Sequence, residues 1–296
     1  MHRDPRAFAL IALALEMVAA PALAQTPDMA VGPQYDTAHI YVAPADMSAF
    51  ATAFTATFGG VAAKPGVTHV TPTPSSANWQ AIQTPEGTIS VFGFTTPVHY
   101  PFGAEWTGYL VKDMNTAIAA ARAAGADVLV APFPDPIGQD AVVQWPGGVN
   151  MQFYVHNTPP SYPPFATIPE NRVYVSPDRA AAIVAAFVAF AHGTVTQDDA
   201  AAPGVEIGRP GDVFREIRIE SGFGKVTVLV TDGHLPFPYG RETTGYEVAD
   251  LAKTLARAAQ AGAIVLTPAF TSRDRTSAVV QFPGGYIAEI HASARP

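Results

Sequence analysis

Two carboxylates and a histidine near the C-terminal end of the chain occur at the spacing of residues that share one face of a sheet. In an extended strand Glu289 and His291 point to the same side, while Ile290 between them points to the other. Glu247 lies in an earlier strand-like run and alternates in the same way. If they face one cavity, these three groups would support general acid–base catalysis, because crowding and burial separate their pKa values. Binding of a single divalent ion by the same three groups, and a polar lining without catalysis, are the alternatives.

The segments that carry these residues are copies of segments found earlier in the chain. Residues 103–156 match residues 240–293 without a gap at a constant shift of 137 positions. The agreement is clearest between TGYLVKDMNTAIAAARAAGADVL at 107–129 and TGYEVADLAKTLARAAQAGAIVL at 244–266. A register kept over this length indicates an internal duplication. A proline-rich stretch at 157–170 is expected to separate the two copies as a stiff linker.

Each copy divides into two smaller units of the same plan, in which a strand-like run leads through an Asp suited to a helix N-cap into a helix. The expected first strands are 39–42, 108–111, 172–175 and 245–248. The expected N-caps are Asp46, Asp113, Asp178 and Asp250. The expected helices are 47–58, 114–124, 179–192 and 251–261. The β-type runs that follow them are 88–94, 141–145, 149–155, 213–219, 225–231, 278–282 and 286–291. The pattern predicts an α+β fold of four βαβββ units, two in a domain at 36–156 and two in a domain at 171–293.

Composition narrows the classes of function. The chain has 296 residues with 17 Lys and Arg against 25 Asp and Glu, a net charge of −8, and no run of basic residues. Nucleic acid and anionic membrane surfaces are therefore poor candidate partners. The chain has no Cys, which excludes disulfides, thiolate metal ligands and cysteine nucleophiles.

The first residues follow the order of a secretory signal. Arg3 and Arg6 precede an apolar run at 7–20, and Ala22 and Ala24 supply the small residues of a cleavage site. The apolar run is too short to cross the hydrocarbon core of a membrane, which needs about 20 residues. We therefore expect residues 1–24 to be a cleaved signal peptide and the mature protein to be periplasmic or secreted.

Two stretches resemble the vicinal oxygen chelate superfamily, which includes glyoxalases, bleomycin-resistance proteins and extradiol dioxygenases. The opening DTAHIYVAPADMSAFATAFTATFGG at 36–60 is similar to the family's first strand, with its His, running into the first helix. The closing FPGGYIAEIHA at 282–292 looks like the Gly-x-x-x-Glu end of a last strand. The resemblance covers roughly residues 36–293. It implies two glyoxalase-like domains whose curved mixed sheets each form a cup for a substrate.

The resemblance also implies where a divalent ion would be bound. In the N-terminal domain the ligand positions fall on His39, on Trp106 or Thr107, and on Gln152. In the C-terminal domain Glu289 holds the last-strand position. The remaining positions of that domain are Asn171, Val228 and Thr243. A catalytic divalent site takes about three His or carboxylate ligands. Neither cup reaches that number, so His39 and Glu289 are the candidate metal ligands, while metal catalysis of the glyoxalase type is disfavoured.

The cup of the N-terminal domain would then be lined mainly by aromatic and amide side chains. The candidate ligand-binding residues are His39, Tyr41, Trp106, Gln152 and Tyr154. Aromatic walls with a few polar groups suit a neutral or aromatic small molecule. Filling of the cup by Trp106 and Tyr154 as core is the alternative. The segments 61–78 and 196–212 are long and polar, and their positions make them candidate lid loops.

The sequence favours an exported protein that binds a small organic molecule in a sheet cup. Because metal ligands are missing, we expect this protein to have no complete catalytic metal site. The alternative is a divalent-metal-dependent lyase, isomerase or dioxygenase of the vicinal oxygen chelate type, and an interaction module with no small ligand is a third interpretation. The first requires no cofactor and the second requires one divalent metal ion. The expected partner is a small organic molecule, with no nucleic acid and no membrane after signal cleavage. The residues leave enzymatic activity open, and monomer and homodimer are equally compatible with them.

Overall fold

The structure is a computed structural model that describes residues 28–237 and 240–293. The predicted signal peptide at 1–24 lies outside these residues. Over the described ranges, no helix combines the length and the apolar character needed to cross a membrane.

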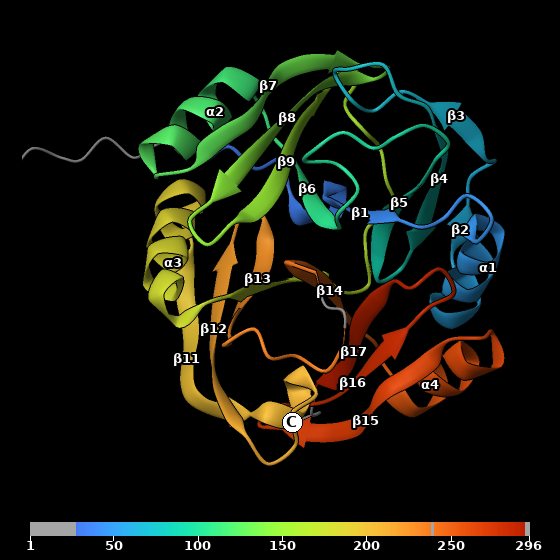
Figure 1. Ribbon diagram of the computed structural model, residues 1–296, viewed down its shortest axis with the longest axis vertical. Coiled ribbons are helices and arrows are strands. Elements are labelled where there is room, and N and C mark those ends of the chain that lie inside the picture. Colours follow the sequence, from blue (N-terminus) through green and yellow to red (C-terminus); the bar gives the residue numbers. More distant parts are fainter. Residues whose placement is uncertain (1–27, 238–239, 294–296) are drawn as a thin grey trace, which may run out of the picture.

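The first half of the chain forms one curved sheet (Figure 1). Its strands are ordered β2-β4-β5-β1-β6-β9-β8-β7, and β3 pairs with β4 beside this path. The bounds are β1 (Thr37–Tyr41), β2 (Val61–Ala62), β3 (Gly66–Thr68), β4 (Ala77–Thr84), β5 (Gly87–Phe94), β6 (Trp106–Leu110), β7 (Asp127–Asp135), β8 (Gly138–Trp145) and β9 (Val149–His156).

The second half repeats this plan in a second sheet, ordered β11-β12-β13-β10-β14-β17-β16-β15. The bounds are β10 (Glu170–Val175), β11 (Thr194–Pro203), β12 (Val213–Ser221), β13 (Gly224–Val230), β14 (Glu242–Glu247), β15 (Ile264–Ser272), β16 (Arg275–Gln281) and β17 (Ile287–Ser293). The described residues also form two short 3-10 helices, η1 (Pro33–Tyr35) and η2 (Gly204–Ile207).

Strand pairing defines the four units. In each unit the first strand pairs in parallel with the last, as β1 does with β5, β6 with β9, β10 with β13 and β14 with β17. The units join in antiparallel pairs through β1 and β6 in the first sheet and through β10 and β14 in the second. The result is two βαβββ units in each of two curved mixed sheets, which confirms the predicted fold class.

One helix belongs to each unit. The helices are α1 (Met47–Phe58), α2 (Met114–Ala123), α3 (Pro177–Ala191) and α4 (Leu251–Gln260). Asp113 and Asp250 cap α2 and α4, each accepting a hydrogen bond from a backbone N–H three residues on, at 2.7 and 3.0 Å. Asp46 precedes α1 without such a bond. The predicted N-cap of α3 is wrong: Ser176, two residues before Asp178, holds that position. Asp178 lies in the first turn of α3, where its negative charge interacts favourably with the helix dipole.

The sequence pattern does not predict the outermost strands of three units. The strands β7, β11 and β15 are mostly exposed, and each is interrupted by register shifts against its neighbour. Without a steady inside–outside alternation they carry no clear strand signal. The expectation of a loop at 196–212 is therefore wrong for its first part, which is strand β11 followed by η2. The loop expected at 61–78 is likewise interrupted by the short strands β2 and β3, and its last two residues begin β4.

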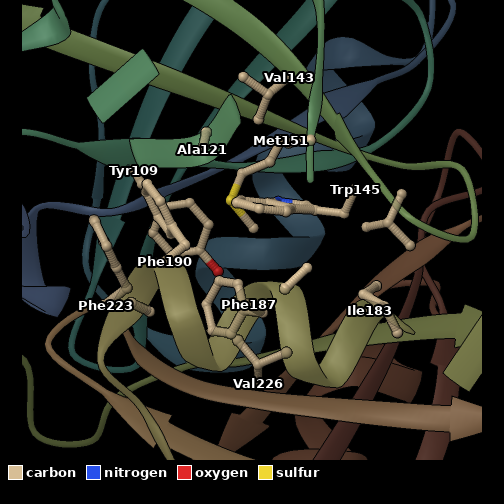
Figure 2. Packing of buried hydrophobic residues seen from close by; sticks show 14 of the residues in the cluster. Tyr109, Ala121, Val143, Trp145, Met151, Ile183, Phe187, Phe190, Phe223 and Val226 are labelled. Atoms are coloured by element: carbon tan, nitrogen blue, oxygen red, sulfur yellow. The ribbon is translucent and has the colours of Figure 1, made fainter. Parts of the chain in front are cut away.

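The two domains are joined through their helix layers. In Figure 1 α2 lies beside α3 on one side of the molecule and α1 lies beside α4 on the other. One apolar core includes residues of α2, α3 and both sheets, and a second includes residues of α1, α4 and both sheets. Figure 2 shows the first of these cores, in which Phe190 of α3 stacks on Phe223 beside Trp145 and Met151 of the N-terminal domain. The opposite face of each sheet is left to form the cup.

Candidate functional site

The cup of the N-terminal domain contains a cavity of about 380 Å³. Alternate residues of the central strands line it, among them Thr37, His39 and Tyr41 of β1. The intervening residues Ala38 and Ile40 belong instead to the apolar core under α1. The period-two geometry of the strands therefore separates a polar and aromatic cup from a purely apolar layer.

Four of the five predicted ligand-binding residues, His39, Tyr41, Gln152 and Tyr154, line this cavity. Trp106 is fully buried and lies behind the lining, packed edge-on against Tyr41. The side chains of Phe102, Phe133 and Val142 form a small apolar cluster around it. The structure brings the five residues together, and their roles in binding stay a prediction.

Two segments far from the sheet centre complete the walls of the cavity. From the predicted lid segment 61–78, residues Val67 to Val70 lie against the cavity. From the proline-rich segment 157–170, Tyr162 contributes its ring and packs against Tyr35. The cup is thus covered by the segment around β3, which lies beside the main strand order of the sheet, and by the proline-rich segment.

The indole N–H of Trp106 lies between the two polar residues that the resemblance assigned to a metal. Nε1 donates to Nδ1 of His39 and to Oε1 of Gln152, at 3.1 Å in each case. Because Nδ1 of His39 accepts, the proton of the neutral ring is on Nε2. Burial lowers the pKa of His39 to about 4, so the ring is neutral near pH 7.

These residues do not fit a divalent ion. A metal would need the lone pairs of His39 and Gln152, and both are directed at the indole proton. Thr107, the other candidate at this position, faces away from the cup and hydrogen-bonds Glu242 of the C-terminal domain. Among the residues that the structure describes, no group of three or more His, Asp or Glu side chains is arranged to hold a metal.

Asp140 is the residue of this cup that the sequence analysis missed. It lies on β8 opposite Tyr154 of β9, lines the cavity and is 6% exposed. Burial, and after it the nearby charge of Asp135, raise its pKa to about 8, and a hydrogen bond with Gln152 opposes the rise. The expected strand began one residue later, at 141, because Asp is unfavourable in strands. Extending the hairpin outward from its Gly-Gly turn would have placed Asp140 across from Tyr154.

The cup of the C-terminal domain is filled by ion pairs. Arg172 contacts Glu170 at 2.7 Å and Glu206 at 2.6 Å, and Arg275 contacts Glu170 at 2.9 Å. All four side chains are at most 4% exposed. Glu206 reaches the cluster from η2, which follows strand β11. We refer to Glu170, Arg172, Glu206 and Arg275 as the ionic cluster.

The predicted acid–base residues lie at the side of this cluster. Nδ1 of His291 is 2.8 Å from the Glu289 carboxylate. Burial alone would raise the pKa of Glu289, but His291 and then Arg172 outweigh it and hold the pKa at about 2. Glu247 is opposite His291 in the strand register, and its carboxylate binds Lys225 at 3.1 Å and Ser293 at 2.6 Å. The three residues share one cup face. Glu289 pairs with His291, Glu247 is held by Lys225 and Ser293, and the space beside them is about 120 Å³.

The strand register corrects two of the positions assigned by resemblance. Trp106 pairs with His39, and its repeat equivalent Thr243 pairs with Arg172. The counterpart of His39 is therefore Arg172, and Asn171 instead points to the other face, where it donates to the Tyr109 hydroxyl at 2.9 Å. Val228 likewise belongs to an apolar core and not to the cup. The C-terminal cup thus holds an arginine where the N-terminal cup holds an imidazole.

Comparison with known proteins places this architecture among solved structures. No protein-family model matches the chain, and no curated protein sequence matches it. A triple mutant of 4-hydroxymandelate synthase from Streptomyces coelicolor is similar with a TM-score of 0.64 and 14% identity, over 91% of this chain and 95% of that chain. The Mn(II)-bound glyoxalase from Novosphingobium aromaticivorans is similar with a TM-score of 0.53 and 12% identity, over 90% of this chain and 83% of that chain. A catechol 2,3-dioxygenase has a TM-score of 0.51 and 12% identity, over 88% of this chain and 87% of that chain.

These structures share two sheets of paired βαβββ units with the present chain. The chain therefore has the vicinal oxygen chelate fold, as its resemblance to that superfamily predicts. The low identity means that this likeness concerns the fold alone. What the protein does has to be inferred from its own two cups.

Proposed function

We propose that this protein is an exported binding protein that holds a small organic molecule in the cup of its N-terminal domain, without metal catalysis. The observation that carries the proposal is the cavity of about 380 Å³, which has the size of a small-ligand site. Its walls combine aromatic rings with a few buried polar groups, a combination that gives both contact area and orientation.

The contrast between the two cups supports the same conclusion. Both cups are built from the same repeated unit, but the ionic cluster occupies the second cup and leaves only about 120 Å³ beside it. In the first cup the equivalent of Arg172 is the smaller and neutral His39. The free volume of the first cup is thus a property of its side chains and not of the fold.

Thermal unfolding in the presence of small aromatic compounds tests the proposal. A ligand at 100 times its dissociation constant adds about 2.7 kcal/mol to the free energy of unfolding, which raises the unfolding midpoint by several degrees. Trp79 lines the cavity, so its fluorescence gives a second signal. We expect Ala81→Trp, which places a large ring in the cavity lining, to abolish the effect of any compound that raises the midpoint. Ala252→Trp, on the exposed face of α4, adds the same ring outside the cavity and should leave the effect intact.

Two outcomes would contradict this proposal. One is a midpoint shift that survives Ala81→Trp, because the ligand would then be bound elsewhere. The other is a stoichiometric divalent ion in the purified protein that is lost in His39→Ala, because this would support the metal-dependent lyase, isomerase or dioxygenase alternative. That alternative is kept because a Mn(II)-bound glyoxalase has the same fold. Export is tested separately by the N-terminal residue of the protein recovered outside the cytoplasm, which should be Gln25.

A further inference from the structure

The acidic side chains that line the N-terminal cavity have no Lys or Arg side chain beside them in the described lining. Asp135 and Asp140 are both among its lining residues, and no Lys or Arg of the described chain is among them. Three histidines, His39, His69 and His156, also line the cavity. Burial lowers the pKa of His39 to about 4 and lowers the pKa of His156, so these two rings are neutral near pH 7.

The third histidine is held by the backbone. Nδ1 of His69 hydrogen-bonds the carbonyl oxygen of Ser75. The cavity therefore presents two carboxyl groups and no Lys or Arg side chain among its described lining residues. An anionic ligand would meet these carboxyl groups with no Lys or Arg of that lining to pair with.

Asp140 is the carboxyl group that needs a partner. It is 6% exposed, and within the described part of the chain it forms no ion pair, in contrast to every carboxylate of the ionic cluster. A buried carboxylate is costly unless a positive group or several hydrogen bonds compensate it. The carboxyl group of Asp140 lies at the cavity, so a ligand is in a position to supply that positive group.

The rings of the cavity suit the same kind of ligand. Tyr41, Trp79, Phe92, Phe102, Tyr154 and Tyr162 all contribute to the lining, and Tyr41 stacks on Phe92 with centroids 5.5 Å apart. The face of an aromatic ring attracts a cation, and more strongly when both are removed from water. Apolar parts of the ligand gain from the same rings by burial.

We infer that the ligand of the N-terminal cavity is an organic cation, an amine on an aromatic or other apolar body, whose ammonium group pairs with Asp140. The inference rests on the proposed function and narrows it to one chemical class. It excludes carboxylates and phosphates as ligands of this cavity. It also makes Asp140 a binding residue that selects the charge of the ligand.

Three probes of nearly equal shape test the inference by calorimetric titration: benzylamine, benzyl alcohol and sodium benzoate. The titrations are made near pH 8.5, above the raised pKa of Asp140, where its carboxyl group is largely ionised while the alkylamine is still protonated. We expect benzylamine to bind tightest, benzyl alcohol more weakly, and benzoate not measurably. Asp140→Asn keeps the shape of the side chain and removes its charge. It should weaken benzylamine binding about 30-fold, the loss typical of one partner of a buried ion pair, and change benzyl alcohol binding less than about threefold. Asp127→Asn makes the same charge change at an exposed position of β7 and should change neither.

The outcomes separate this inference from the function on which it rests. Benzyl alcohol or benzoate binding as tightly as benzylamine, or benzylamine binding unaffected by Asp140→Asn, would overturn the cation inference while leaving a small-molecule site in place. Failure of all three probes, together with no midpoint shift from any aromatic compound, would overturn both. If only neutral compounds raise the thermal unfolding midpoint, the inference that the ligand is a cation would be overturned and the proposed small-molecule site would remain.

Discussion

At the scale of single residues, the most consequential side chain in the N-terminal cup is Trp106. One indole N–H satisfies both His39 and Gln152, so the position that a metal would need is filled by a proton donor. This arrangement engages lone pairs of both side chains and makes them a neutral, hydrogen-bonded part of the cavity wall. The wall in turn orients the amide of Gln152, which hydrogen-bonds Asp140.

Replacing the indole should therefore change the metal chemistry of the cup. We expect the double variant Trp106→His with Gln152→Glu to bind Mn²⁺ or Zn²⁺, because it brings two imidazoles and a carboxylate to one place, the minimum of a divalent site. Titration calorimetry with each ion measures the change. The protein without these substitutions and the variant Trp106→Phe, which keeps a ring without the N–H, should bind neither ion. Tight metal binding by Trp106→Phe would show that removing the indole N–H is sufficient and that the added ligands are not required.

At the scale of elements, the C-terminal cup shows how equivalent strands form a closed cup when their inward side chains are charged. Strands β10 and β16 and the short helix η2 each contribute to the ionic cluster. The cluster connects three separate elements across the cup, as a ligand would. Its members are buried, so each depends on the others for compensation of its charge.

Removing one member should destabilise the fold far more than removing an exposed pair. Arg172→Met leaves Glu170 and Glu206 buried with less positive charge and should cost about 3–5 kcal/mol of unfolding free energy. Arg215→Met breaks the exposed pair with Asp198, whose side chains are 44% and 45% exposed, and should cost at most about 1 kcal/mol. Urea unfolding measures both. Equal losses in the two variants would show that the cluster adds nothing to stability.

The sequence predicts these elements well where alternation and capping are clear. The four helices and the strands that begin each unit lie within a few residues of their predicted positions, because strong apolar periodicity marks them. The residues predicted to line the first cup do lie together, because the alternation along their strands correctly assigned them to one face of the sheet. The identity of Arg172 as the cup residue was missed, because a slip of one position in a strand transfers a side chain to the opposite face. The ion pairs of Glu206 with Arg172 and Arg275 depend on contacts between distant elements, which no local pattern contains.

At the scale of the whole molecule, buried polar groups join the inner strands of the two domains. Thr107 of β6 hydrogen-bonds Glu242 of β14, and Asn171 donates to Tyr109. Burial raises the pKa of Glu242 to about 8, with the Thr107 hydrogen bond opposing the rise. Glu105 lies nearby with a pKa that burial and then the Glu242 charge raise. The contact between the domains is therefore built with carboxyl groups that favour their protonated form.

This contact should make stability depend on pH in one direction. Between about pH 4.5 and 8 Glu242 retains its proton when folded and has lost it when unfolded, so unfolding releases a proton and stability falls as pH rises, by up to about 1.4 kcal/mol per pH unit. Glu242→Gln keeps the hydrogen-bonding shape without the titration. We expect this variant to match the unsubstituted protein near pH 5 and to be more stable near pH 8, as measured by denaturant unfolding. The difference between the two proteins isolates Glu242, because His39 contributes with the opposite sign below about pH 6.5. An unchanged difference across this range would contradict the assignment.

The aromatic cores that hold the domains together lie on the helix side of both sheets, while the residues to which we assign ligand binding line the cup side. Substitutions at the cup therefore leave the inter-domain packing largely untouched. Ligand preference is then free to diverge between descendants of this chain without loss of folding. The two cups of the present protein, one open and one closed by ion pairs, already represent two results of such divergence from a single duplicated ancestor.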